Sequence, residues 1–246
     1  MPGHGPVASQ STNTSFAITL VPVAATDRNA HPSRPTSPPE TQVGQRYGRW
    51  RVSANTTNLR SPRQAGVVLR RRLEEQGWRY SDGYCGPPAD GRWCCECYPY
   101  TTLVGAAELG YDLERPRYKR KPRAMPAAQW RPTRQAACDD LIRRLTRLAQ
   151  ADPPLRLDSH PVTRQLAAEP SPLTDAAYKH REDLIDALLC AWTAALWSRH
   201  GTDRCQILGP PKPDATETVA TIIAPARPEQ RRYVFTPNRA HGGMFR

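Results

Sequence analysis

The stretch from residue 175 to 199 constrains the fold more than any other part of this 246-residue chain. Its apolar residues recur at helical spacing, and it is followed by Gly201, the residue type expected just beyond a helix end. A helix of this length with a broad apolar face needs other elements to cover that face. The sequence therefore predicts a long, largely buried helix late in the chain.

Shorter patterns surround this helix. Apolar residues at helical spacing alternate along the chain with short runs of strand character, and Pro or Gly marks the breaks between them. Residues 161–172 contain several prolines and are interpreted as a linker. The expected elements are helices at 65–73, 101–109 and 138–148, and strands at 92–98, 205–208 and 218–224. These elements predict an α/β domain with a mixed sheet flanked by helices.

The composition changes near residue 45. Residues 1–45 carry seven prolines, many Ser and Thr residues, and only four charged side chains. Such a segment is typical of a disordered tail, with a short strand at the apolar island over residues 16–24. We therefore expect a disordered Pro-rich tail at 1–41, a folded domain at 42–226 and a basic C-terminal tail at 227–246.

The charge balance indicates an acidic partner. The chain has 35 Lys and Arg against 23 Asp and Glu, a formal net charge of +12, which makes nucleic acid the first expectation. No run approaches the roughly 18 apolar residues of a membrane helix, and the N-terminus lacks the pattern of a secretory signal. We therefore expect no membrane contact and a cytoplasmic location.

Seven cysteines, an odd number, argue against a disulfide framework and favour a reducing compartment. Cys94, Cys95 and Cys97, together with Cys85, could supply a zinc site. However, neighbouring residues of a strand point to opposite faces, so buried thiols are the alternative interpretation.

Three carboxylates are the candidates for chemistry. Asp183 and Asp186 stand three residues apart on the long helix, a spacing that brings side chains to similar faces, and Glu96 lies in the strand at 92–98. Carboxylates near a buried face need a partner, and salt bridges to neighbouring basic residues are one alternative. The other is a site of hard oxygen ligands for Mg or Mn that cleaves phosphodiesters. On that hypothesis Glu96, Asp183 and Asp186 are both catalytic residues and metal ligands.

A basic segment follows at 115–134, with eight Lys or Arg residues, no acid, and Tyr118 and Trp130 interleaved. A solvated loop is the plain interpretation. The alternative is contact with nucleic acid, through cations on phosphates and aromatic rings stacked on bases. The candidate nucleic-acid-binding residues are Arg115, Arg117, Lys119, Arg120, Lys121 and Arg123.

Five stretches of the chain, in order, resemble the family catalogued as domain of unknown function four-twenty-nine, which is predicted to consist of ribonuclease-H-like nucleases. They are residues 46–58, 96–100, 118–121, 183–194 and 222–225. The helix motif Asp-x-x-Asp-Ala-Leu is also similar to the Holliday-junction resolvase branch of that superfamily. The resemblance covers roughly 42–226 and implies that Glu96 is the carboxylate of a middle strand, with Asp183 and Asp186 as the helix carboxylates.

The sequence departs from this pattern at its N-terminal end. The resemblance implies a further aspartate on a first strand, but Thr19 stands at the matching place in the apolar island. We therefore expect an N-terminally incomplete ribonuclease-H-like fold, in which loss of the bridging acid would weaken metal binding and catalysis. The alternative is a catalytically degenerate nucleic-acid-binding or structural protein of the same fold. An incomplete sheet edge is also compatible with a homodimer.

Overall fold

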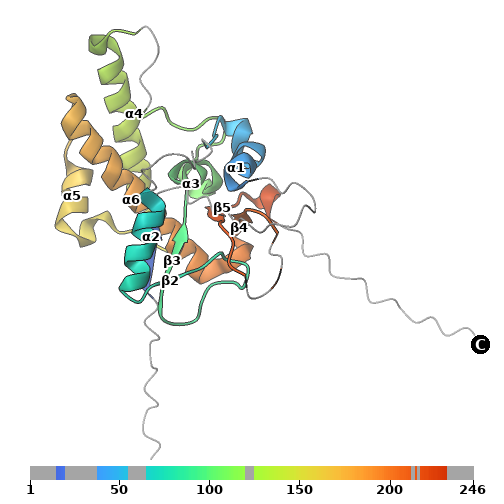
Figure 1. The fold of residues 1–246 in the computed structure, drawn as a ribbon. Coiled ribbons are helices and arrows are strands. Elements are labelled where there is room, and N and C mark those ends of the chain that lie inside the picture. Colours follow the sequence, from blue (N-terminus) through green and yellow to red (C-terminus); the bar gives the residue numbers. More distant parts are fainter. Residues whose placement is uncertain are drawn as a thin grey trace, which may run out of the picture.

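The computed structural model describes the backbone of residues 15–19 and, in full, residues 38–54, 66–119, 125–211, 214 and 217–231, with Ala65 added as backbone alone. These residues form a mixed α/β fold with two small sheets and six α-helices (Figure 1). Most of the predicted N-terminal and C-terminal tails lies outside the described residues. No described helix combines the length and the apolar character needed to cross a membrane.

The first sheet is parallel. Strands β1 (Ser15–Thr19), β3 (Arg92–Glu96) and β2 (Arg79–Tyr80) lie in that order, so β3 is central. Strand β1 pairs with β3 in a register that places Thr19 opposite Glu96. The apolar island therefore forms a strand, as its composition predicts, and this strand fills part of the expected N-terminal gap. The residue opposite Glu96 is nevertheless not an acid.

The second sheet is an antiparallel pair of β4 (Cys205–Leu208) and β5 (Ile222–Pro225). A single parallel bridge between Cys97 and Ile223 connects it to the end of β3. The strand predicted at 205–208 is confirmed, and the one predicted at 218–224 begins later and ends one residue further on.

The helices are α1 (Pro39–Tyr47), α2 (Ala65–Glu75), α3 (Pro99–Gly105), α4 (Ala127–Arg147), α5 (Pro161–Ala168) and α6 (Asp175–His200). Helix α6 is the predicted long buried helix, and α2 is followed by Gly77 at φ 80° as expected for a helix stop. Two expectations were wrong. Helix α4 begins at Ala127, so the second half of the basic segment is helical, and α5 occupies the predicted linker.

Strand β3 separates two helical layers (Figure 1). Cys94 lies near Arg70 and Glu74 of α2, whereas Cys95 lies near Cys190 of α6. Because side chains alternate along a strand, α2 covers one face of β3 and α6 the other. The core is centred on α6, which packs against α3, β1 and β5.

Helix α1 is fastened to the C-terminal strands. The buried hydroxyl of Tyr47 donates to the carbonyl oxygen of Pro225 at 2.5 Å. The amide of Gln42 bonds the backbone of Gly209 in both directions, donating to the carbonyl at 2.7 Å and accepting from the N–H at 3.0 Å. Residues from opposite ends of the described chain thus form one packed unit.

The seven cysteines all lie among the described residues, and all but Cys85 are buried. Burial raises the pKa of the Cys94 thiol to about 11, so this thiol stays protonated at neutral pH. Among the described residues, no group of three or more His, Cys, Asp or Glu side chains is arranged to hold a metal ion. The six cysteines other than Cys85 therefore lie as buried thiols.

Candidate functional site

The candidate site lies where the segment after Asp112 crosses α6, beside the end of β3. Tyr118 and Lys119 from this segment reach Asp186 on α6, while Tyr98 and Tyr100 follow β3 directly. Ligands of open parallel sheets bind at the carboxyl ends of the strands. The location is therefore one where the fold class commonly places function.

Both carboxylate oxygens of Asp186 are engaged by protein groups. The Tyr118 hydroxyl donates to Oδ1 at 3.0 Å, and the Lys119 ammonium forms a short ion pair with Oδ2. The side chains of Lys119 and Asp186 are 21% and 16% exposed. Burial raises the pKa of Tyr118 well above its usual value, so the phenol remains a donor. Asp186 is thus a largely buried carboxylate with one hydrogen bond and one counter-ion.

Asp183 does not share this environment. Its side chain is 59% exposed and forms an ion pair with Lys179 on the outer side of α6. The inward neighbour of Asp186 is Glu182, whose side chain is 12% exposed. Burial raises the pKa of Glu182, while Lys119 and Lys179 oppose that shift. The pair that faces the site is therefore Glu182 and Asp186, and not the predicted Asp183 and Asp186.

The sequence held the signal for Glu182. Each helical residue turns the side-chain direction by about 100°, so residues four apart differ by about 40° and residues three apart by about 60°. Asp183 also precedes the fully buried Ile185 by two residues, which places it about 160° away on the solvent side. Apolar spacing alone therefore distinguishes Glu182 from Asp183 once Ile185 is taken as the centre of the buried face.

Glu96 lies on the other face of the strand. It is 5% exposed, and its charge contributes to raising the pKa of Tyr80 on β2, after the dominant effect of burial. Alternation puts Glu96 on the face of Cys94, toward α2, whereas Asp186 belongs to α6. The predicted ligands Glu96, Asp183 and Asp186 thus lie in three different environments.

A divalent metal does not fit the described residues as they are arranged. Mg and Mn need several oxygen ligands directed at one point. Asp186 is occupied by Tyr118 and Lys119, Asp183 by Lys179, and no three-residue group of metal-ligating side chains forms in the part of the chain that the structure describes. The metal assignment of the sequence stays a prediction.

Aromatic rings line the same region. Tyr98 and Tyr100 pack edge to face with centroids 5.6 Å apart, and the Arg115 guanidinium lies 4.3 Å from the centroid of Tyr100. Burial raises the pKa of Tyr100 to about 12, with Asp186 and Glu182 adding to the shift. The rings expected to stack on bases, Tyr118 and Trp130, are buried instead. Tyr98 and Tyr100 are the half-buried rings that the sequence interpretation passed over.

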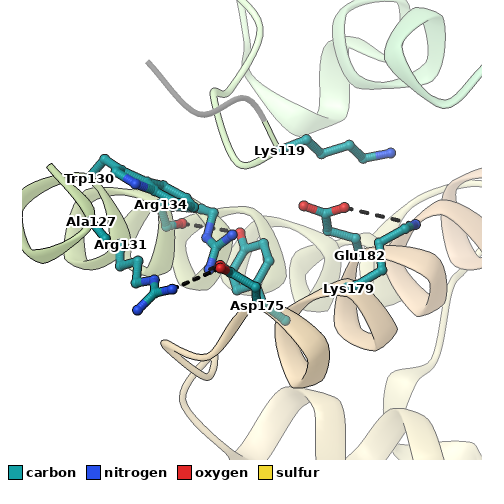
Figure 2. A pocket seen from close by; sticks show the side chains of 9 residues that line it. Lys119, Ala127, Trp130, Arg131, Arg134, Asp175, Lys179 and Glu182 are labelled. Atoms are coloured by element: carbon teal, nitrogen blue, oxygen red, sulfur yellow. Dashed lines mark hydrogen bonds and ion pairs between the residues drawn. The ribbon is translucent and has the colours of Figure 1, made fainter. Parts of the chain in front are cut away.

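A cavity of about 330 Å³ adjoins this cluster between α4 and the start of α6 (Figure 2). The Arg134 guanidinium lies between the rings of Trp130 and Tyr178, at 4.2 and 3.7 Å from their centroids. Asp175 pairs with Arg131 at 2.8 Å and with Arg134 at 3.1 Å. The lining consists of Lys119, Ala127, Trp130, Arg131, Arg134, Asp175, Tyr178, Lys179 and Glu182.

The predicted nucleic-acid-binding residues separate into three groups. Arg117 is exposed and pairs with Glu114, while Arg115 donates to the carbonyl oxygen of Arg51 at 2.8 Å. Lys119 turns inward to Asp186. The remaining three, Arg120, Lys121 and Arg123, lie outside the described residues.

The excess of positive charge lies mostly outside the described fold. The described residues hold 24 of the 35 Lys and Arg residues and 22 of the 23 Asp and Glu residues. The described part is therefore close to neutral, and 11 basic residues and one acid belong to the rest of the sequence.

Fold and site together define a mixed α/β protein with a cluster of tyrosine, lysine and carboxylate side chains at the end of its central strand. The chain belongs to the family described as protein of unknown function (DUF429), whose model matches residues 23–213. The match begins upstream of residue 42, where the resemblance was expected to start, and ends before residue 226. No curated protein and no solved structure matches the chain.

Proposed function

We propose that this protein binds nucleic acid through the surface formed by Arg115, Arg117, Tyr98 and Tyr100, without a metal ion at the carboxylates of α6. The observation that carries the proposal is the course of the segment at 115–119. Arg115 lies over the half-buried ring of Tyr100, and Arg117 is exposed to solvent. Lys119, at the end of the segment, neutralises Asp186.

A surface that holds cations beside aromatic rings can bind both the phosphates and the bases of a nucleic acid. Lys and Arg neutralise phosphates, and bases stack on rings or on guanidinium planes. Arg115 over Tyr100 supplies a guanidinium plane backed by an aromatic ring, and the exposed Arg117 stands two residues away. Because the described fold is close to neutral, the contact proposed here depends on these local groups and not on the net charge of the fold.

Metal-dependent cleavage of nucleic acid, with Mg or Mn held by Glu96, Asp183 and Asp186, is the second candidate. One observation favours it: Asp186, one of the three predicted ligands, contributes together with Glu182 to the raised pKa of Tyr100, so two carboxylates lie close to the end of β3. It requires Asp186 and Asp183 to exchange their lysine partners for a metal, and Glu96 to reach the face of β3 on which Asp186 lies. An assay of cleavage therefore separates the two candidates.

The binding test compares two matched arginines. Arg117 and Arg143 are 65% and 68% exposed, and each pairs with an acid three residues before it. We expect Arg117→Gln to weaken binding of labelled single-stranded and duplex DNA and RNA, and to reduce the salt slope by about one. Arg143 belongs to α4 and lies outside the site, so Arg143→Gln should leave the affinity for nucleic acid unchanged. Equal affinity of the two variants would assign binding to another surface.

The cleavage test uses the same oligonucleotides in Mg, in Mn and in EDTA. We expect the wild type to bind in EDTA and to leave the strands intact under all conditions. Metal-dependent cleavage by the wild type that is lost in Asp186→Asn would contradict our proposal and support the second candidate, metal-dependent cleavage of nucleic acid.

A further inference from the structure

The Lys119 ammonium lies among side chains that favour a positive charge. It pairs with Asp186, and it lies 5.2 Å from the ring centroids of both Tyr100 and Tyr118. The Glu182 side chain lines the same cavity as Lys119. Figure 2 shows the Lys119 side chain extending across the same space that the Glu182 carboxylate faces. One carboxylate and two aromatic rings thus lie around the ammonium group, and a second carboxylate lines the cavity beside it.

The other lysine near this pair has a different position. Lys179 belongs to α6 itself, is 64% exposed, pairs with Asp183 and reaches Glu182 only at 4.0 Å. Lys119 comes from a separate segment and is about four-fifths buried. Lys119 is thus the inner counter-ion of Asp186, in the cavity that Glu182 also lines, whereas Lys179 is a counter-ion on the outer side of the helix.

A buried pair of carboxylates needs compensation. Two ionised carboxylates one helical turn apart repel each other, and burial removes the water that would weaken this repulsion. A proton, a metal ion or a protein cation can restore balance. A lysine attached to the same chain has a high effective concentration, so it competes well against a free ion.

We propose that Lys119 is an internal counter-ion that closes the Glu182–Asp186 pair to divalent cations, so that removal of its charge uncovers a cation site. The inference explains why the carboxylates of α6 do not fit a metal ion while Lys119 is paired with Asp186. It does not depend on nucleic-acid binding, because it concerns only the occupancy of the carboxylate pair.

The test is titration of Mn²⁺ by calorimetry into the wild type and into Lys119→Met, whose unbranched side chain extends as far as the lysine Cε and lacks the charged ammonium group. We expect Mn²⁺ to bind the variant more tightly by a factor on the order of ten or more, because the competing unit charge at hydrogen-bond distance is gone. Mn²⁺ should also raise the melting temperature of the variant more than that of the wild type.

Two control variants assign the effect. Lys179→Met removes an ammonium from the outer side of α6 and should bind Mn²⁺ no better than the wild type. The double variant with Lys119→Met and Asp186→Asn should lose the gained affinity, because it lacks the carboxylate that Lys119 released.

The proposal is wrong if Lys119→Met binds Mn²⁺ no more tightly than the wild type. It is equally wrong if the wild type binds Mn²⁺ as tightly as Lys119→Met does, and if this binding is lost in the single variant Asp186→Asn. Lys119→Gln is a second neutral variant, which serves if Lys119→Met does not fold. If both neutral variants fold only when Mn²⁺ is present, the proposal is supported, and if neither folds even with Mn²⁺, it is overturned.

Discussion

The hydroxyl of Tyr118 gives a quantitative test of the Asp186 cluster. Tyr118→Phe removes a single oxygen and keeps a ring that is fully buried. A hydrogen bond to a charged acceptor contributes about 1.5–3 kcal/mol. Because the Asp186 side chain retains 16% exposure, water can replace part of the lost bond. We expect the free energy of unfolding to fall by about 2 kcal/mol, which lowers the melting temperature of a domain of this size by about 4–8 °C.

The assay is urea unfolding of a double-mutant cycle with Asp186→Asn. A bond to a neutral acceptor contributes only about 0.5–1.5 kcal/mol, so Tyr118→Phe should cost about 1 kcal/mol in the Asn background, at unchanged m-value. Tyr84→Phe is the control, because its hydroxyl donates to the carbonyl oxygen of Pro210 at 2.7 Å, outside the cluster. Its cost should be the same in both backgrounds. An equal cost of Tyr118→Phe in both backgrounds would refute the charge-assisted bond to Asp186.

Two further predictions concern backbone packing and pH. Gly105→Ala would place its Cβ 2.1 Å from the carbonyl oxygen of Pro225, so α3 and β5 must separate, and we expect a loss of about 3 kcal/mol in chemical unfolding. Gly44→Ala, with nothing within 4 Å, should instead be neutral or stabilising by up to about 1 kcal/mol. Burial raises the pKa of Glu182, so the stability contributed by this group is complete below its ordinary pKa and is lost as the pH rises through the raised value. Thermal melts should therefore show Glu182→Gln gaining stability relative to wild type as the pH rises above the ordinary glutamate pKa of about 4.3, and a constant difference would contradict the raised pKa.

The strongest periodic patterns were sufficient to predict the elements that carry the site. The long helix α6 and the central strand β3 follow from helical spacing and from alternation, because both elements bury one face against a neighbour. The face of α6 that Asp183 occupies was assigned from its spacing to Asp186 alone. A carboxylate motif fixes a distance along the helix, but only the buried apolar residues fix which side faces inward.

Proline was the main reason that helices were missed. Helices α1 and α5 begin with Pro39 and Pro161, where the missing N–H has no intrahelical partner to lose. The sequence interpretation took these prolines as marks of a tail and a linker. Helix α4 even continues through Pro132, since packing of Trp130 and Cys138 against the core supports the turns on either side. The inward course of Lys119 has no periodic signal, because it results from the tertiary position of a loop.

The attachment of α1 to the C-terminal strands sets the order in which the protein can be completed during synthesis. Gln42 and Gly209 are 167 positions apart, and Tyr47 and Pro225 are 178 apart. At roughly 5–20 residues per second, a ribosome needs on the order of ten to thirty seconds to produce the partners of α1 after α1 itself. During that interval the buried side of α1, including Val43 and Tyr47, has no native partner among β4 and β5. Helix α3 can already pack against α1 at that stage, but the side of α1 that contacts β4 and β5 stays uncovered. A ribosome that stalls before residue 205 therefore leaves this side of α1 accessible to chaperones and proteases.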